Sequence, residues 1–324
     1  MGRIKVSGGF TQLKLTLMRY SKVFVVYDRN VLEYVEKFAS GKPMFAIEAS
    51  EDQKTMPTVM SICRWLLEQG ADRSALLLAV GGGITSDLAG FAASIYKRGI
   101  RYANITTTLL AMVDAGIGGK TGVNVDGYKN MLGVIRQPEF VYICPPVLTT
   151  LPSRDFRSGA AEMLKTFLIK DSENYAKALK VLSEPFNAEA IEPLISAAAR
   201  IKAGIVRKDE FETGPRRVLN LGHTYGHAIE WWQHTNNVEE PYTHGEAIAI
   251  GIIQAAVKSE SLGKAKPGLA DKLRADFNYC GLPTELPCSD TELQDAIRQD
   301  KKAEGGKLNF VFIKDIGKVE VERI

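Results

Sequence analysis

The chain has 324 residues, of which 45% are hydrophobic and 24% charged, and its 41 Lys and Arg nearly balance its 38 Asp and Glu. This length exceeds one ordinary hydrophobic core and predicts two domains. A formal net charge of only +3 argues against nucleic acid or an anionic membrane as the main partner, so any positive charge that matters must be local.

The first half of the chain alternates short apolar runs with helical patterns, as expected for βαβ units on a parallel sheet. The predicted strands are residues 22–28, 75–82, 102–108 and 140–144, and the predicted helices are residues 55–70 and 87–96. Polar side chains at the carboxyl ends of such strands, here Asp28 and Asn30, are placed to hold a ribose or a base.

A glycine turn, Gly81 to Gly83, joins the second predicted strand to the helix that contains Asp87. Glycines at such a turn let the backbone approach a pyrophosphate, whose charge meets the positive end of the helix dipole. The run does not match G-x-G-x-x-G, so a tight turn without a ligand is an equal alternative.

A second glycine-rich stretch, MVDAGIGGKTGVN, resembles a Walker A loop, but Asp114 stands where that motif needs its first glycine. We interpret the stretch as a glycine-rich turn, with Lys120, Lys129 and Asn130 on flexible backbone. These side chains suit a phosphate or a carboxylate, and solvated surface lysines are the alternative.

After residue 150 the pattern changes to successive helices. Pro145, Pro146 and Pro152 punctuate the change, so we expect domains at 1–150 and 151–324. The predicted helices are residues 154–169, 187–206, 244–260 and 270–280, and residues 308–321 predict a closing hairpin.

All four histidines lie between residues 223 and 244. His223 and His227 are four apart and share one helix face, and His244 opens a helix that Thr243 and Glu246 would cap. A metal site would need a third ligand, and Glu162 is a candidate. Glu162 and Lys165 fall on one side of a helix whose other side is apolar, so an exposed ion pair remains an alternative. For His223 and His227, the alternative is that both are hydrogen-bonded polar residues at an interface between helices.

Seven stretches of this chain resemble the 3-dehydroquinate synthases, a family of sugar phosphate cyclases. They are GGGITSDLAGF, YKRGIRYANITTTLLAMVDAGIGGKTGVN, YKNMLG, LPSRDFRSGAAEMLKT, RRVLNLGHTYGHAIE, HGEAIAIG and DKKAEGGKLNFV. They follow the family's order and spacing, and the resemblance covers almost everything from about residue 22 to the C-terminus. The departures are a shortened set of opening strands and Ser86, which replaces a glycine of the first motif.

The resemblance implies an NAD-binding Rossmann-like α/β domain with a parallel sheet at 1–150 and a mainly α-helical metal- and substrate-binding domain at 151–324. The implied reaction converts 3-deoxy-arabino-heptulosonate 7-phosphate to 3-dehydroquinate and phosphate, in the shikimate pathway toward chorismate. NAD oxidises the substrate transiently, phosphate leaves, the ketone is reduced again, and an aldol step closes the ring. Zinc or cobalt would assist the elimination of phosphate.

The resemblance also implies roles for individual residues. The metal ligands would be Glu162, His223 and His244. The catalytic residues would be Glu212, His227, Lys165 and Lys120. The substrate would contact Arg98, Lys120, Lys129, Asn130, Lys165, Lys202, Arg216, Asn220 and one of Lys301 or Lys302. NAD would contact Asp28, Asn30, Glu51, Lys54, Gly82, Gly83, Asp87, Thr107, Thr108, Asp114, Lys129 and Thr150. His234 matches no motif and is expected on the surface.

A homodimer is implied as well, with Arg98 reaching the neighbouring subunit's active site. We expect a cytoplasmic protein with no nucleic-acid or membrane partner, because the sequence has no C-x-x-C pair, no signal-like start and no apolar run of spanning length. Two other activities are weighed: a cyclase for a different sugar phosphate, and a glycerol-dehydrogenase-like polyol oxidoreductase. The first would not need the carboxylate donors, and the second lacks GIGGKT and YKN.

Overall fold

A computed structural model describes residues 2–126, 128–289, 291–294, 297 and 309–323. The chain divides into two compact units, Met1–Leu151 and Pro152–Ile324. One of Lys301 and Lys302 is expected to contact the substrate. Both lie outside the described residues.

Unit 1 is built on a six-stranded, all-parallel sheet in the order β1-β8-β5-β4-β2-β3. The strands are β1 (Arg3–Val6), β2 (Val23–Asp28), β3 (Met44–Ile47), β4 (Leu76–Gly81), β5 (Arg101–Thr106) and β8 (Phe140–Ile143). β4 and β8 are buried throughout, as expected when helices cover both faces of a parallel sheet. The four predicted strands are confirmed, and β1 and β3 are additions.

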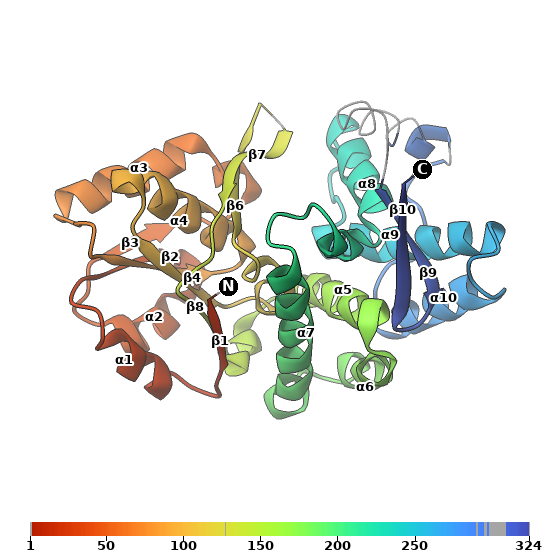
Figure 1. The fold of residues 1–324 in the computed structure, drawn as a ribbon, viewed down its shortest axis with the longest axis horizontal. Helices are drawn as coiled ribbons and strands as arrows, with labels where there is room; N and C mark the ends of the chain where they lie inside the picture. Colours follow the sequence, from red (N-terminus) through yellow and green to blue (C-terminus); the bar gives the residue numbers. More distant parts are fainter. Residues whose placement is uncertain (1, 127, 290, 295–296, 298–308, 324) are drawn as a thin grey trace. The chain divides into compact units, whose positions relative to one another are not determined.

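Helices cover both faces of this sheet, with α1 and α2 on one side and α3 and α4 on the other (Figure 1). Their bounds are α1 (Thr11–Leu17), α2 (Leu32–Ala39), α3 (Met56–Glu68) and α4 (Gly83–Ile95). Strand residues two apart share a face, so Phe24 and Val26 pack with Leu77, Val59 and Ile62 in one core cluster. The short helical turns of the unit are η1 (Arg29–Val31), η2 (Glu51–Gln53), η3 (Tyr96–Arg98), η4 (Ala111–Ala115) and η5 (Pro145–Thr150).

The glycine-rich stretch after β5 turns at residues 116–119, as predicted, but Lys120, Lys129 and Asn130 lie on the strands of an antiparallel hairpin and not on flexible backbone. The hairpin consists of β6 (Lys120–Val125) and β7 (Tyr128–Ile135). Gly122 and Gly133 are paired across it, and a Cβ on Gly133 would lie 2.2 Å from the carbonyl oxygen of Thr121. The glycines therefore allow two backbones to approach closely, a role that a sequence cannot distinguish from flexibility.

Unit 2 consists of helices and a two-stranded hairpin. The helices are α5 (Ser153–Lys170), α6 (Ser172–Ser183), α7 (Ala188–Lys208), η6 (Pro215–Asn220), α8 (His223–Thr235), α9 (His244–Ser261) and α10 (Leu269–Tyr279). The strands are β9 (Asn309–Asp315) and β10 (Lys318–Arg323). The helices and the hairpin predicted here are confirmed, and α6 is an addition. One detail is corrected: every residue of α5 from Ser158 to Ile169 is buried, so this part of the helix has no solvated side.

Glycines set the spacing of α5, α8 and α9. A Cβ on Gly245 would lie 2.0 Å from the carbonyl oxygen of Ser158 in α5, and one on Gly251 would lie 2.1 Å from that of Gly222, which precedes α8. A Cβ on Gly226 would lie 2.6 Å from the side chain of Ile248. These three helices can approach as they do only because no side chain stands between their backbones.

Two negative findings apply to the described residues. Among them, no helix combines the length and apolar character that crossing a membrane requires. All four cysteines are free thiols; Cys144 and Cys280 are buried, and Cys63 and Cys288 are partly buried.

The glycine contacts predict opposite effects of two Gly→Ala substitutions. Gly251→Ala should lower the free energy of unfolding by about 1–3 kcal/mol, because the new methyl group meets a backbone oxygen that cannot move aside alone. Gly204→Ala is the matched control in α7, where a Cβ would meet nothing within 4 Å, and it should raise stability by about 0.5–1 kcal/mol. Urea unfolding followed by circular dichroism measures both. Equal stability of the two variants would contradict the close-packing argument.

Candidate functional site

Three side chains of unit 2 converge from three helices. Glu162 lies in the middle of α5, His223 is the first residue of α8, and His244 is the first residue of α9. One ligand atom from each lies within 4.8 Å of the other two. The structure thus brings together the three residues predicted as metal ligands, and a carboxylate with two imidazoles is a donor set that suits zinc or cobalt.

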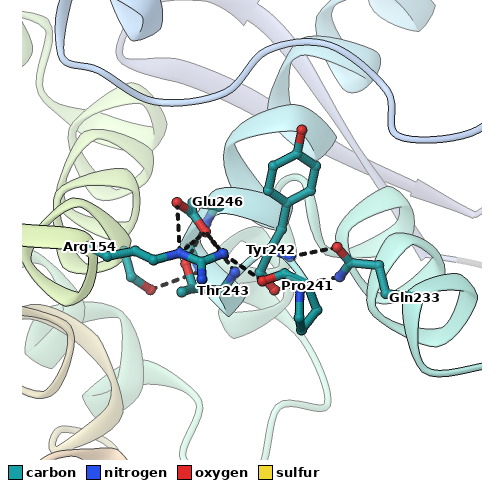
Figure 2. Close-up of polar contacts among 8 residues, drawn as sticks. Arg154, Gln233, Pro241, Tyr242, Thr243 and Glu246 are labelled. Carbon is teal, nitrogen blue, oxygen red and sulfur yellow. Dashed lines mark hydrogen bonds and ion pairs between the residues drawn. The ribbon is translucent and has the colours of Figure 1, made fainter. Parts of the chain in front are cut away.

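The turn that leads into His244 is clamped by an arginine from α5 (Figure 2). Arg154 donates hydrogen bonds to Glu246 Oε2 from Nε at 3.2 Å and from Nη2 at 3.1 Å, and to the Pro241 carbonyl at 2.5 Å. Glu246 also accepts the Thr243 N–H at 2.7 Å, and the Thr243 hydroxyl accepts the Glu246 N–H at 3.4 Å. The predicted capping box is confirmed.

Two further contacts hold the same turn. Gln233, in α8, accepts the Tyr242 N–H at 2.6 Å and donates to the Tyr242 carbonyl at 3.5 Å (Figure 2). The Gly245 N–H donates to the Ser158 hydroxyl at 3.0 Å. Side chains from α5 and α8 therefore hold the backbone on both sides of His244.

The Glu162 carboxylate is completely buried, at 0% exposure, and Lys165 Nζ lies 2.5 Å from its Oε2. Neither carboxylate oxygen makes a well-formed hydrogen bond with a described residue, so the lysine contact is an ion pair only. Burial alone would raise the pKa of Glu162, but Lys165 and then His244 hold it at about 2. An ionised, buried carboxylate with unused lone pairs fits a cation. The alternative of an exposed ion pair is wrong.

The His223 ring is oriented through Nδ1, which lies 3.2 Å from the Leu221 carbonyl oxygen. Burial, helped by the charge of Lys165, lowers the pKa of His223 well below its usual value, so the ring is neutral at pH 7. With Nδ1 engaged, Nε2 is the nitrogen left for an ion. The His227 ring lies nearby, edge-on to His223 with centroids 5.1 Å apart and tilted to His244 with centroids 6.3 Å apart.

The His244 ring lies between two carboxylates. Its Nε2 is 3.6 Å from Glu162 Oε1, and its Nδ1 is 3.5 Å from Glu230 Oε2. Burial would lower the pKa of His244, but these two carboxylates raise it to about 10. The ring is therefore protonated at neutral pH, and an ion bound at Nε2 would displace that proton.

A second group of predicted residues sits on the loop between α7 and η6. Glu212 accepts a hydrogen bond from Asn220 Nδ2 at 2.7 Å, and its Oε2 lies 3.8 Å from Nε of the buried Arg216. The backbone of Glu212 is left-handed, with φ of 60°. Strained non-glycine backbone of this kind concentrates at functional sites.

Asp209 organises this loop. Its carboxylate accepts the backbone N–H groups of Thr213 at 3.0 Å, Gly214 at 2.7 Å and Arg216 at 3.0 Å. Burial would raise the pKa of Asp209, but the three N–H groups outweigh it and lower the pKa. The ionised carboxylate thus holds the turn that presents Glu212 and Arg216.

Two lysines predicted to meet the substrate are buried, Lys165 at 1% exposure and Lys202, on α7, at 6%. Lysines are rarely buried unless they are paired. Both interact with other groups of the chain, Lys165 with Glu162. Unit 2 therefore carries localised positive charge although the whole chain is nearly neutral.

In unit 1 the predicted NAD contacts gather at the carboxyl edge of the sheet. Three neighbouring strands, β2, β4 and β5, carry these residues at their ends. Asp28 is the last residue of β2, Gly82 and Gly83 follow β4, and Thr107 and Thr108 follow β5. The chain changes direction along the sheet between β2 and β4, because β3 lies on one side and β5 on the other. Ligands of open parallel sheets bind at such a switch point.

The glycine turn is shaped for close backbone approach. Gly82 is the N-cap of α4 and supplies no capping side chain, and a Cβ on it would lie 2.9 Å from the Thr108 side chain. A Cβ on Gly83 would lie 3.0 Å from that of Ala115. The N-cap residue thus makes no side-chain hydrogen bond to the first N–H groups of α4, which fits a pyrophosphate at this end of the helix.

Lys54 connects residues predicted for the cofactor and for the substrate. Its Nζ lies 2.6 Å from Asp87 Oδ2 and donates to Asn130 Oδ1 at 2.5 Å. The Asn130 N–H donates to Asn124 at 2.8 Å, and Asn124 donates to Glu51 at 2.8 Å. A hydrogen-bonded network thus holds β7 against α4 and η2.

The remaining predicted NAD contacts lie in turns of the same unit. Asp28 accepts the Asn30 N–H at 3.0 Å, and the Thr150 hydroxyl lies 3.3 Å from that of Tyr34. Asp114 lies in η4, a π-helical turn, and such turns recur at functional sites.

Three further predicted substrate contacts are residues of unit 1. The side chains of Lys120 and Lys129 are exposed on the β6–β7 hairpin. Arg98 ends η3, between α4 and the start of β5, and so lies at the amino edge of the sheet, opposite the glycine turn. Its backbone and that of Lys97 are left-handed, with φ of 66° and 50°.

Several residues that hold predicted site residues in place were not themselves predicted. They are Glu230 beside His244, Arg154 on Glu246, Asp209 in its loop and Asn124 between Glu51 and Asn130. Glu230 carried a detectable signal, because it is seven residues after His223 and therefore on the same helix face. His234 is exposed, as predicted.

Family models and relatives agree with these observations. A 3-dehydroquinate synthase N-terminal model matches residues 44–158, and a 3-dehydroquinate synthase C-terminal model matches residues 159–303. The chain is 41% identical over 310 residues to the 3-dehydroquinate synthase of Acidithiobacillus ferrooxidans strain ATCC 53993 / BNL-5-31, covering 91% of this chain and 83% of the relative. It is 38% identical over 305 residues to that of Leptospira interrogans serovar copenhageni, covering 92% and 83%.

A solved structure shares the fold. The 2-epi-5-epi-valiolone synthase from Streptomyces hygroscopicus subsp. jinggangensis 5008, with NAD+ and Zn2+ bound, superposes with a TM-score of 0.88 at 26% identity, covering 99% of this chain and 92% of that one. Two family models that together span most of the sequence, and relatives of this identity and coverage, establish that the chain belongs to the 3-dehydroquinate synthase family.

Proposed function

We propose that this protein is a 3-dehydroquinate synthase, a lyase that converts 3-deoxy-arabino-heptulosonate 7-phosphate to 3-dehydroquinate and phosphate in the shikimate pathway. The carrying observation is the convergence of Glu162, His223 and His244 beside the buried Lys165, in a chain of this family. Free cysteines are consistent with a reducing compartment, so we place the enzyme in the cytoplasm.

Two non-protein groups complete the chemistry. Glu162, His223 and His244 would hold zinc or cobalt, and the carboxyl edge of the unit 1 sheet, with Gly82 and Gly83, would hold NAD. When bound, the ion lowers the pKa of a substrate hydroxyl, and NAD takes up and returns one hydride. Two observations support these assignments: the buried Glu162 oxygens accept no well-formed hydrogen bond from a described residue, and the N-cap residue of α4 provides no side-chain cap.

The chain's own residues bind the substrate and move protons. A substrate with a carboxylate and a phosphate needs several cationic donors, and the buried Lys165, Lys202 and Arg216 provide fixed ones. Glu212 is held by Asn220 and can accept a proton, and His227 lies beside both histidine ligands as a second acid-base group. Lys120, Lys129 and Asn130 extend from the hairpin of unit 1 as further donors.

The buried cations also favour this substrate over a neutral sugar phosphate. A substrate without a carboxylate would bring one anionic group fewer to Lys165, Lys202 and Arg216. The cost of burying these cations would then be compensated less. The buried cations therefore favour a sugar acid phosphate as substrate, and the substrates of the other cyclases come second.

We further propose that the enzyme is a homodimer in which Arg98 completes the neighbouring subunit's phosphate site. Arg98 lies at the amino edge of its own sheet, away from the glycine turn at the carboxyl edge, so a role at its own NAD site has no support. A left-handed backbone at Lys97 and Arg98 is a strained conformation that a functional constraint would explain.

Turnover should proceed without net formation of NADH, because the hydride taken from the substrate returns to it. With 3-deoxy-arabino-heptulosonate 7-phosphate and catalytic NAD, released phosphate and dehydroquinate should appear in equal amounts while NADH absorbance stays flat. NADH that accumulates in step with product would instead indicate a polyol dehydrogenase and contradict the proposal.

Replacement of one proposed ligand should remove metal and activity together. His244→Ala should lower bound zinc to well below one ion per chain, measured by mass spectrometry of the dialysed protein, and should abolish turnover. His234→Ala is the control, since this exposed histidine is on α8 but outside the cluster, and it should keep full metal content. A His244→Ala protein with normal zinc would exclude this ligand set.

Subunit mixing tests the role of Arg98. Arg98→Ala and His244→Ala should each be inactive, and after subunit exchange a mixed dimer should contain one site with both defects and one with neither. Activity should therefore return to a fraction of the wild-type value. If mass spectrometry shows exchanged dimers and no activity returns, Arg98 does not act across the interface.

A further inference from the structure

We propose that Glu230 positions the His244 ring for metal binding, by holding Nδ1 so that Nε2 faces Glu162. The inference rests on the proposed metal site and assigns a role to a residue outside the three ligands. Glu230 contacts the ligand rather than the ion, so it is a positioning residue.

The geometry of one imidazole carries the argument. Glu230 Oε2 lies 3.5 Å from His244 Nδ1, while Nε2 of the same ring lies 3.6 Å from Glu162 Oε1. The ring therefore bridges two carboxylates through its two nitrogens. When an ion displaces the Nε2 proton, a carboxylate at Nδ1 keeps the other proton on Nδ1, so that Nε2 is the nitrogen that meets the ion where the other ligands converge.

The two histidine ligands share this arrangement but have different partners. Nδ1 of His223 lies 3.2 Å from the backbone carbonyl of Leu221, so the main chain orients that ring. His244 has a side-chain partner in the corresponding place. About a third of the His244 side chain, 33%, remains exposed, so contact with Glu230 adds to what packing provides in fixing the ring.

Glu230 itself is well fixed for this task. It is on α8, seven residues after His223, so one helix face presents both groups, and its side chain is only 11% exposed. The spacing of α8 and α9 is in turn set by the contact of Gly251 with Gly222. A carboxylate on a rigid helix, rather than on a loop, can hold an orientation closely.

The same two carboxylates would compensate the charge of an ion that displaces the His244 proton. The carboxylates of Glu162 and Glu230 together match the two charges of a divalent ion, which leaves Lys165 as the surplus positive group. Neutralising Glu230 would remove half of that compensation. Outer partners of this kind typically contribute a factor of about 10–100 in metal affinity.

Zinc affinity is the measurement that tests the proposal, because it does not depend on turnover. In competition with a chromophoric chelator, Glu230→Gln should bind zinc about 10-fold more weakly and Glu230→Leu up to about 100-fold more weakly than wild type. Gln keeps an acceptor oxygen and loses the charge, whereas Leu loses both. The absorption spectrum of the cobalt-loaded protein should shift in both variants, because the ring orientation at the ion changes.

Asp276→Asn is the matched control. Asp276 is about as buried, at 15% exposure, and pairs with Lys272 at 2.8 Å and with the Tyr175 hydroxyl at 3.1 Å, away from the histidines. This variant should keep wild-type zinc affinity. A loss of affinity that Asp276→Asn shares would mean a general loss of structure and would overturn the specific role of Glu230.

The His244→Ala variant distinguishes a failure of the Glu230 proposal from a failure of the proposed metal site. If it loses zinc while both Glu230 variants bind zinc as wild type does, the metal site stands and the role of Glu230 is overturned. If His244→Ala keeps zinc, the proposed metal site itself is wrong. Thermal unfolding of the metal-free proteins completes the test, since Glu230→Gln should melt within about 2 °C of wild type if its role is positioning, a shift below about 1 kcal/mol.

Discussion

The close approach of α5, α8 and α9 is the constraint on which the rest of unit 2 depends. Each proposed metal ligand comes from a different one of these helices, so the ligand set exists only if the helix axes stay close. Glycines at 222, 245 and 251 allow backbone-to-backbone contact where any Cβ would collide. The contacts of Arg154 and Gln233 then hold the turn before His244. The glycines therefore set the spacing of the helices, and these side chains set the orientation of the turn.

The buried charges follow from this packing. Glu162 and Lys165 are both almost fully desolvated, which costs more free energy than an apolar pair would. The cost is offset if the site is used, because an ion would take the unused oxygens of Glu162 and an anionic substrate would meet Lys165. Similar reasoning applies to Arg216 and Lys202, which are buried in a protein of nearly neutral total charge. These buried cations are the groups that we propose to bind the anionic substrate.

Much of the architecture could be predicted from local signals. Apolar runs of strand length, the glycine turn after β4 and the helical periodicity after residue 150 each depend on residues close together in sequence. The motif match extended this to Glu162, His223 and His244. It did not extend to the β6–β7 hairpin, because a glycine that lets two strands touch looks the same in a sequence as one that lets a loop bend.

Burial and contacts between distant elements required the folded chain. An acid three residues before a lysine has the same sequence pattern whether the helix is solvated or enclosed, and α5 is enclosed. The pairing of Glu230 with His244 and the hold of Asp209 on its loop likewise depend on which faces meet. Periodicity specifies the face on which a side chain lies, and the packing of that face against its neighbours specifies what the side chain contacts and whether water reaches it.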